Sequence, residues 1–496
     1  MRVMPPNLVL VIDAGSSSIR CHLVDPAGKV TRSVSRPWAY QDEPDAGTFE
    51  RSFDLEACWK LLCSAISECT SDGEHRPHSV SITSQRQSLV FVDSQGRPIH
   101  AGPNTDTRAV FQGSALDAQH GALLYQTTGH RPTFMMAAGK LAWLRDTRPA
   151  ECEELAHVFT LADWIAYRLT GNLGCEPTLA AASGLLDIRT RTWASDMFEE
   201  LSLRCPKSSL HEATEIRGTV NAREIASISG TPVVVAGADT QCGMLGAGVV
   251  ETGQVGIIAG WSAPVQMLVP EPVQSSEMKT WTGLFQIPEL WALESSAGDI
   301  GNVWHWIVET LSGSGLDYEK LDSLAGTAPL GSFGVTGHFG PQAMDMSVVG
   351  MRLGGILFPT PITFGGPTPG QIGRAALESF SYAIRANLEQ LESESGITAD
   401  SIALGGGLSR STTFRRILPD VLGRPISTYN QSDVTALGCA AIAMTAMGEY
   451  SSLAETAAAA SQEARTSAPG PAAAAEYQDH YERWLEVHES IGPLLA

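Results

Sequence analysis

Apolar runs separated by short polar turns open the chain and predict a small sheet. Residues 8–13 are apolar and β-branched up to a final acid, a pattern typical of a buried strand. A second strand is expected over 18–24 and a third over 30–38, with Asp25-Pro26-Ala27-Gly28 as the turn between them. Three consecutive strands joined by short turns predict an antiparallel meander.

Helical spacing follows the meander. Apolar residues recur with the helical period over 53–69, and Asp54 is the expected N-cap. Strands are expected over 79–83 and 89–93, with the polar cluster 84–87 between them. The segments 140–144 and 161–169 again have amphipathic helical spacing. The first half is therefore predicted to alternate strands and helices.

The second half repeats this order. Strands are expected over 253–259 and 263–269 around a tight turn, as in the opening meander. A strand over 401–404 enters three glycines and then a helix over 411–422, much as the strand over 231–237 leads to Asp239 and a helix start at 242–248. This repetition predicts a duplicated α/β domain with a ligand cleft between the copies and a boundary near 246–252.

The tail of the chain has a different composition. Residues 454–475 are rich in Ala, Ser and Pro and predict an end helix followed by a linker. Residues 477–491 have amphipathic spacing, and we expect a closing helix whose aromatic residues serve packing.

Composition excludes several classes of function. A length of 496 residues predicts two or three domains. The net charge of -21 argues against a nucleic-acid partner, because phosphate contacts need a basic face. The nine cysteines are scattered and never spaced C-x-x-C, which predicts neither zinc nor disulfides. With no leader and no apolar run of membrane length, we expect a cytoplasmic protein that makes no membrane contact.

The first turn is a candidate phosphate site. Gly15 lets the backbone approach a ligand, and Ser16, Ser17 and Ser18 add hydroxyls to the exposed N–H groups. Arg20 adds a cation, whereas Asp13 would repel phosphate unless Mg²⁺ lay between them. The alternative is an ordinary hairpin with a polar turn.

Further candidates stand at other strand ends. Asp239 lies where a strand meets a helix, a position suited to a general base, although helix N-capping is the alternative. Arg86 and Gln87 offer donors for vicinal hydroxyls, the alternative being a structural Arg86 paired with Asp106 or Asp239. The glycines at 405–407 by themselves are weak evidence for nucleotide binding.

The order of the motifs resembles a known family. IDAGSSSIR, TSQRQSLVFVDSQGRPI, NTDTR, KLAWL, LADWIAYRLTG, GLLDIRTRTW, AGADTQCGMLGAG, ALGGGLSRSTTFRRILPDVLGRPI and DVTALGCAAIA occur in the order seen in FGGY-type carbohydrate kinases, from Val9 to Met447. The resemblance implies two ribonuclease-H-like, actin-like domains that bind ATP and Mg²⁺ in an interdomain cleft. Expected domains are 1–248, 249–450, and a tail of linker and helix over 451–496.

The resemblance also implies roles for particular residues. Asp239 would deprotonate a hydroxyl of a small sugar or polyol, and Asp13 with Asp239 would lie at the metal. The substrate side would comprise Gln85, Arg86, Gln87, Asp106 and Thr240. Phosphate and adenosine contacts would come from Gly15, Ser16, Ser17, Arg20, Gly260, Trp261, Ser262, Gly406, Gly407 and Ser409, with Phe414 near the adenosine.

Several positions depart from the family pattern. Trp261 replaces the usual threonine of the second phosphate turn, Asn104 replaces an aromatic residue, and Asp433 replaces a glutamate. The stretch 351–370 lacks a Gly-Glu-Arg motif that many members have. These departures separate the chain from glycerol kinases and ordinary xylulokinases, and Ser84 with the Asn-x-Asp-x-Arg form resembles the autoinducer-2 kinase branch.

The expected activity is ATP-dependent phosphorylation of a ketose, a pentulose first of all. The alternatives are the autoinducer-2 precursor or a glycerol- or erythritol-like polyol. An alternative of another class is a catalytically impaired nucleotide-binding protein with a regulatory role, which the bulky Trp261 keeps open. A homodimer is the default assembly.

Overall fold

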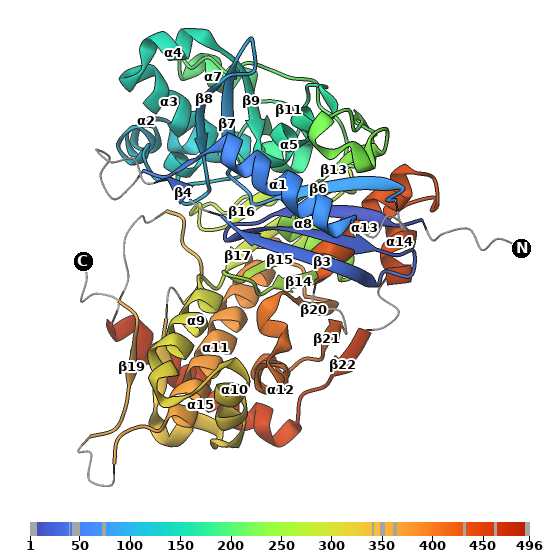
Figure 1. Ribbon diagram of the computed structural model, residues 1–496. Helices are drawn as coiled ribbons and strands as arrows, with labels where there is room; N and C mark the ends of the chain where they lie inside the picture. The colour runs from blue at the N-terminus through green and yellow to red at the C-terminus, as the bar shows by residue number, and fades with distance from the viewer. Residues whose placement is uncertain are drawn as a thin grey trace, which may run out of the picture.

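Two mixed sheets lie at the centre of the molecule in a computed structural model, with helices above and below them (Figure 1). The structure describes residues 7–38, 40–41, 50–71, 76–339, 342–347, 353–360, 365–429, 433–460 and 464–491. Residues 351–352 and 361–364, in the stretch that departs from the family motif, and 461–463 in the tail lie outside that set. Within the described residues, no helix combines the length and apolar character that a membrane span requires.

The first sheet is built around β1, the strand that contains Asp13 and ends at Ala14. Its central strand pairs antiparallel with the next one in the chain and parallel with the strand that ends at Ser84. The order is β12-β13-β6-β1-β2-β3, comprising β1 (Val9–Ala14), β2 (Ser18–Val24), β3 (Val30–Pro37), β6 (Ser79–Ser84), β12 (Gly218–Thr219) and β13 (Pro232–Ala238). The predicted meander is confirmed as β1-β2-β3.

The second sheet repeats this topology. Its strand β14 pairs antiparallel with β15 and parallel with β20, and β21 continues the parallel side. The order is β16-β17-β15-β14-β20-β21-β22, comprising β14 (Gln254–Ile258), β15 (Pro264–Val269), β16 (Trp281–Leu284), β17 (Trp291–Ser296), β20 (Ser401–Gly405), β21 (Ile426–Tyr429) and β22 (Ala464–Ser467). The predicted duplication is therefore confirmed, and both copies place a polar turn between their first two strands.

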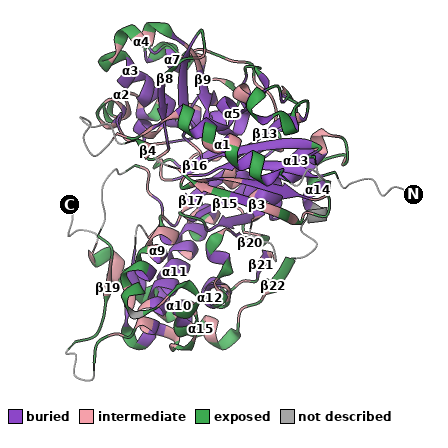
Figure 2. Cartoon of the chain, in the orientation of Figure 1, coloured by how far each residue is buried: buried purple, intermediate pink, exposed green. Residues whose placement is uncertain are grey.

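The helices cover these sheets and bury their apolar faces (Figure 2). Asp54 caps the first helix as expected, since its carboxylate accepts from the N–H groups of Glu56 and Ala57. The helices are α1 (Leu55–Cys69), α5 (Leu161–Thr170), α6 (Pro177–Ala182), α8 (Asp239–Gly246), α9 (Ile300–Leu311), α10 (Tyr318–Thr327), α11 (Pro369–Ser395), α12 (Thr412–Leu422), α13 (Val434–Ala446), α14 (Leu453–Ala460) and α15 (Pro471–Ile491).

An additional layer extends the first half of the chain (Figure 1). The strand predicted over 89–93 forms, but it belongs to a separate three-stranded sheet. That layer comprises β7 (Leu89–Asp93), β8 (Pro98–Gly102), β9 (Leu155–Thr160), α2 (Val110–Thr128), α3 (Ala137–Thr147), α4 (Pro149–Glu154) and α7 (Ser195–Glu200). Short pairs complete the strands: β4 (Tyr40–Gln41) with β5 (Ser52–Phe53), β10 (Leu186–Asp187) with β11 (Thr192–Trp193), and β18 (Thr336–His338) with β19 (Gly355–Leu357).

The tail differs from its prediction in one element. The expected end helix forms as α14, but residues 464–467 of the expected linker form strand β22 at the edge of the second sheet. This strand is mostly exposed and pairs antiparallel with β21. Its backbone hydrogen bonds hold it there rather than apolar side chains, so no alternating pattern marks it in the sequence.

Two helices from opposite halves of the chain cross at glycines. A Cβ on Gly246 of α8 would lie 1.9 Å from the carbonyl oxygen of Val434, and a Cβ on Gly438 of α13 would lie 1.9 Å from that of Cys242. Only glycine permits this backbone approach. The crossing fixes α8, which begins with Asp239, against α13, whose N-cap is Asp433.

We expect the Gly438→Ala variant to lose stability because the added methyl group overpacks this crossing. A loss of about 1–3 kcal/mol in the free energy of unfolding is the magnitude typical of overpacking. Urea denaturation measures it, and Gly313→Ala is the matched control because a Cβ there meets nothing within 4 Å. Equal stability of the two variants would contradict the close crossing.

Candidate active site

The turn between β1 and β2 is held by side chains from three other segments. The carbonyl oxygen of Gly15 accepts from the indole N–H of Trp38 at 2.7 Å and from the Nε2 of Gln85 at 3.3 Å. The Nδ2 of Asn104 donates to the hydroxyl of Ser16 at 3.3 Å. The turn is thus fixed from behind while Ser16 is half-buried and Ser17 is exposed on the other side.

A buried carboxylate lies in the last turn-facing part of β1, one residue before the strand ends. Asp13 is 4 % exposed, and its Oδ2 lies 3.5 Å from the Nη1 of Arg20. The same Nη1 lies 3.5 Å from the Oδ2 of Asp433, so one guanidinium serves a carboxylate from each half of the chain. Burial raises the pKa of Asp13, and the charge of Arg20 opposes that rise. The Oδ1 of Asp13 is buried and has no hydrogen-bond partner among the described residues.

Asp239 begins α8 and does not cap it. The N-cap is Ala238, and among the described residues the Oδ1 of Asp239 accepts from the N–H of the next residue, Thr240, at 2.8 Å. Burial, and then the negative charge of Asp13, raise the pKa of Asp239 to about 6 against the opposing charge of Arg86. The carboxyl is half-buried and lies among charged groups, and its raised pKa is typical of a group that accepts a proton in catalysis.

Arg86 reaches across to the second sheet. Its guanidinium makes a two-point ion pair with Glu294 of β17, in which Nη2 donates to Oε1 at 2.8 Å and Nη1 donates to Oε2. Gln266 of β15 donates to the same Oε2 at 2.6 Å. The guanidinium carbon also lies 5.6 Å from the ring centroid of Trp281, which packs against His130. The alternative of a structural Arg86 paired with Asp106 or Asp239 is wrong as to the partner, because Arg86 pairs with Glu294.

Sequence reasoning missed Glu294 and Gln266, although a signal was present. Gln266 is the one polar residue of the buried strand β15, Glu294 is the one charged residue of the largely buried β17, and the two face each other in the register of these strands. Because buried acids are rare unless they are paired, a lone glutamate in such a strand indicates a distant partner. Only the tertiary structure shows that this partner is Arg86.

The second turn has the same position in the second sheet. The carbonyl oxygen of Trp261 accepts from the N–H groups of Gly301 and Asn302, each at 3.1 Å, which joins the turn to the start of α9. The Trp261 side chain is 50 % exposed, so the indole extends outward rather than into the core. Gly260 is exposed and Ser262 is half-buried.

The glycine loop after β20 packs against Ala259, which lies between β14 and the second turn. Gly406 has a φ of +85°, and a Cβ there would lie 2.5 Å from the carbonyl oxygen of Ala259. The hydroxyl of Ser409 donates to the carbonyl oxygen of Gly406 at 2.7 Å and closes the loop. A Cβ on Gly407 would meet nothing within 4 Å, whereas Phe414 is fully buried in the core.

Two residues expected on the substrate side are engaged elsewhere. The fully buried Asp106 pairs with Lys140 at 2.9 Å and with Arg108 at 2.8 Å. Burial opposes its ionisation, but the hydrogen bond from His100 and the charge of Lys140 outweigh burial and hold the pKa of Asp106 below its ordinary value. Gln87 is buried, has a φ of +55° and donates to the carbonyl oxygen of Ala182 at 3.1 Å. Both side chains support the loops around the site.

The family of the chain follows from comparisons with known proteins. Residues 8–246 match the N-terminal domain of the FGGY family of carbohydrate kinases, and residues 256–447 match the C-terminal domain. An autoinducer-2 kinase from Escherichia coli is 30% identical over 516 residues, which cover 97% of this chain and 94% of that protein. The chain belongs to the FGGY family of carbohydrate kinases and is a sugar phosphotransferase.

Solved structures have the same fold. The xylulose kinase from Lactobacillus acidophilus superposes with a TM-score of 0.84 at 20% identity, covering 97% of this chain and 98% of that one. The Plasmodium falciparum glycerol kinase with ADP has a TM-score of 0.84 at 18% identity, covering 98% of each chain. At these identities the likeness concerns the fold, which is the two-domain actin-like ATPase fold that the sequence resemblance implied.

We expect Glu294→Gln to weaken acceptor binding more than ATP binding. Without the carboxylate charge, Arg86 keeps less of its two-point support, and its donors no longer point in one fixed direction. The KM for the acceptor should rise about tenfold, which corresponds to about 1.4 kcal/mol, with little change in the KM for ATP. Steady-state kinetics measure both, and Glu309→Gln, an exposed glutamate of α9, is the matched control. An equal rise in the two KM values would contradict a selective effect of Glu294 on the acceptor side.

Proposed function

We propose that the protein transfers the terminal phosphate of ATP to a hydroxyl of a small sugar or polyol, with Asp239 as the general base. The observation that carries this proposal is the environment of Asp239, a half-buried carboxyl with a pKa of about 6 beside Asp13 and Arg86. Phosphoryl transfer needs little covalent chemistry from the protein, because positioning and charge stabilisation supply most of the acceleration. A base of moderate pKa completes that set by accepting the proton of the attacking hydroxyl.

The two polar turns are the proposed phosphate contacts. Gly15 and Gly260 shape the two turns, and their own N–H groups donate to the carbonyl oxygens of Ser18 and Ile258. The proposed phosphate donors are therefore the backbone and hydroxyls of Ser16 and Ser17 in the first domain, and those of 261–262 in the second. Arg20 contributes a cation beside Asp13. The loop at Gly406, Gly407 and Ser409 is the proposed adenosine contact, since Gly407 is exposed and leaves space for a flat ring. A fold neighbour was solved with ADP, which supports a nucleotide in this architecture.

The residues present fit a magnesium ion. The buried Oδ1 of Asp13 lacks a hydrogen-bond partner among the described residues, and the negative charge of Asp13 in turn raises the pKa of the neighbouring Asp239. No group of three or more metal-ligating side chains occurs in the described part of the chain. That is compatible with Mg²⁺, which usually takes one or two carboxylates and completes its shell with water and phosphate oxygens. Asp13 and Asp239 would hold the ion, which when bound neutralises phosphate charge.

The proposed acceptor side is built on Arg86, Glu294 and Thr240. Arg86 is oriented by Glu294 and backed by Trp281, so its remaining N–H groups have a fixed direction from which to bind vicinal hydroxyls. The first candidate acceptor is a pentulose. The second is autoinducer-2, favoured by the curated relatives whose similarity extends over 97% of this chain.

An acceptor screen by coupled ADP release tests this choice. Pentuloses, hexuloses, glycerol, gluconate and the autoinducer-2 precursor are compared at equal concentration with purified protein and Mg²⁺-ATP. We expect one ketose-type compound to exceed the polyols in kcat/KM by at least about tenfold, because a hydroxyl or carbonyl in the wrong place leaves buried donors unpaired. No turnover with any compound, despite ATP binding, would favour the nucleotide-binding regulatory alternative.

The base is tested by substitution and by pH. Asp239→Asn should lower kcat by about 10²–10⁴-fold, the usual contribution of a general base, while ATP binding and the melting temperature stay close to wild type. The base acts as the carboxylate, so in the wild type kcat/KM should fall about tenfold for each pH unit below its pKa of about 6. This acid limb should vanish from the residual activity of the variant. Near-normal turnover of Asp239→Asn would exclude the role.

A further inference from the structure

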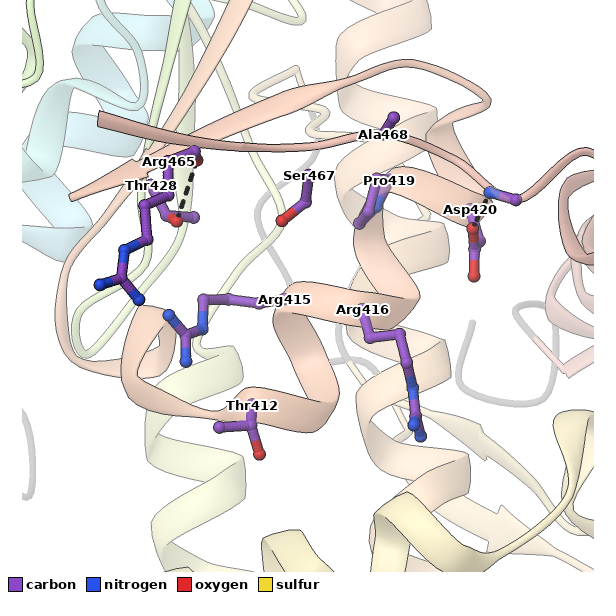
Figure 3. Close-up of a pocket in the computed structure, with 10 residues that line it drawn as sticks. Thr412, Arg415, Arg416, Pro419, Asp420, Thr428, Arg465, Ser467 and Ala468 are labelled. Atoms are coloured by element: carbon purple, nitrogen blue, oxygen red, sulfur yellow. Dashed lines mark hydrogen bonds between the residues drawn. The ribbon is translucent and has the colours of Figure 1, made fainter. Parts of the chain in front are cut away.

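A pocket of about 460 Å³ lies at the edge of the second sheet, outside the site around Asp239. It is an open pocket lined by residues of α12, of β21 and of the unexpected strand β22, together with residues from 468–470 that follow it (Figure 3). None of the residues assigned above to phosphate, adenosine or acceptor contacts lines it. The protein has a net charge of -21, yet this pocket is lined by the guanidinium-bearing residues Arg415, Arg416 and Arg465.

Two of these arginines point into the same part of the pocket. Figure 3 shows the guanidinium groups of Arg415, from α12, and Arg465, from β22, on the same side and close to Thr428. The Nε of Arg415 is buried and has no hydrogen-bond partner among the described residues. No ion pair joins either guanidinium to a carboxylate within the part of the chain that the structure describes. Two like charges held near each other repel, and an anion between them would remove that cost.

The other polar groups of the pocket are engaged or face elsewhere. The Nη2 of Arg416 donates to the carbonyl oxygen of Gly326 at 2.9 Å. Among the described residues that line the pocket, Asp420 is the one carboxylate, and its Oδ1 accepts from the N–H of Gly470 at 2.7 Å. Figure 3 shows Asp420 at the opposite end from Arg415 and Arg465. The hydroxyl of Ser467 points into the space between the strand and α12 and is a further donor for an anion.

We propose that Arg415, Arg465 and Ser467 form a second anion site that binds a phosphoryl dianion, either inorganic phosphate or the phosphate group of a small phosphomonoester. The planar guanidinium fork matches the spacing of phosphate oxygens and donates two parallel hydrogen bonds. The volume of the pocket exceeds that of phosphate alone and accommodates a small organic group beside it. The bound anion would join β22 to α12, the helix that begins directly after the loop at Gly406–Ser411.

Direct binding measurements test this site. Equilibrium dialysis with radiolabelled inorganic phosphate is compared for the wild type, Arg465→Gln and the double variant Arg415→Gln/Arg465→Gln. Arg465 is exposed, so its single variant keeps the fold even if the partly buried Arg415 does not tolerate change. Arg223→Gln, an exposed arginine in the first half of the chain, is the control with the same change of charge.

We expect one phosphate per chain in the wild type and in Arg223→Gln, at least tenfold weaker binding in the double variant, and an intermediate loss in Arg465→Gln. Competition then distinguishes the sources of the ligand. Displacement by glycerol 3-phosphate at lower concentration than by inorganic phosphate identifies a phosphomonoester site, and the reverse order identifies a free-phosphate site. Wild-type affinity in the double variant, or no saturable binding in the wild type, overturns the proposal.

Discussion

The close crossing of α8 and α13 is the constraint on which the candidate site depends. Gly246 and Gly438 let the two backbones touch, and no larger residue fits at either position. The crossing brings the start of a helix from the first half of the chain beside the start of a helix from the second, where the Thr435 hydroxyl lies 3.4 Å from the carbonyl oxygen of Asp239. It thereby sets the position of Asp239 relative to Asp433 and Arg20. A carboxyl carried on a flexible loop would not keep such neighbours.

Two arginines, Arg20 and Arg86, each act on more than one carboxylate of the candidate site. Arg20 lies between Asp13 and Asp433, and Arg86 is paired with Glu294 while its charge still acts on Asp239. The two arginines leave the carboxyls of Asp13 and Asp239 with raised pKa values, because burial outweighs the attraction. Mutual repulsion of these carboxyls favours a cation between them, and the same repulsion makes one of them a suitable proton acceptor. The proximity of Asp13 and Asp239 thus supports both of the proposed roles, metal binding and proton acceptance.

The pair of Arg86 and Glu294 gives the site an interdomain character. Arg86 follows β6 of the first sheet, and Glu294 lies within β17 of the second, so the acceptor contacts proposed for Arg86 depend on how the two domains meet. The pair is nearly buried, and removal of one partner would leave a charge unbalanced in a region of low dielectric constant. A change in the angle between the domains would move the donors of Arg86. Under the proposed function, acceptor binding would therefore respond to the relative position of the two domains.

The sequence by itself determined the local elements, the duplication and the family. Apolar, β-branched runs around Gly15 and Gly260 specify the strand–turn–strand units, because β-strand preference and glycine act over a few residues. It also determined Asp13 and Asp239 as acids at strand ends. Only the tertiary structure decided that Arg86 pairs with Glu294, 208 residues away, that Asp106 belongs to a buried ion cluster, and that residues 464–467 form an edge strand. Those outcomes depend on contacts between distant segments and on backbone pairing, neither of which leaves a periodic pattern in the amino-acid sequence.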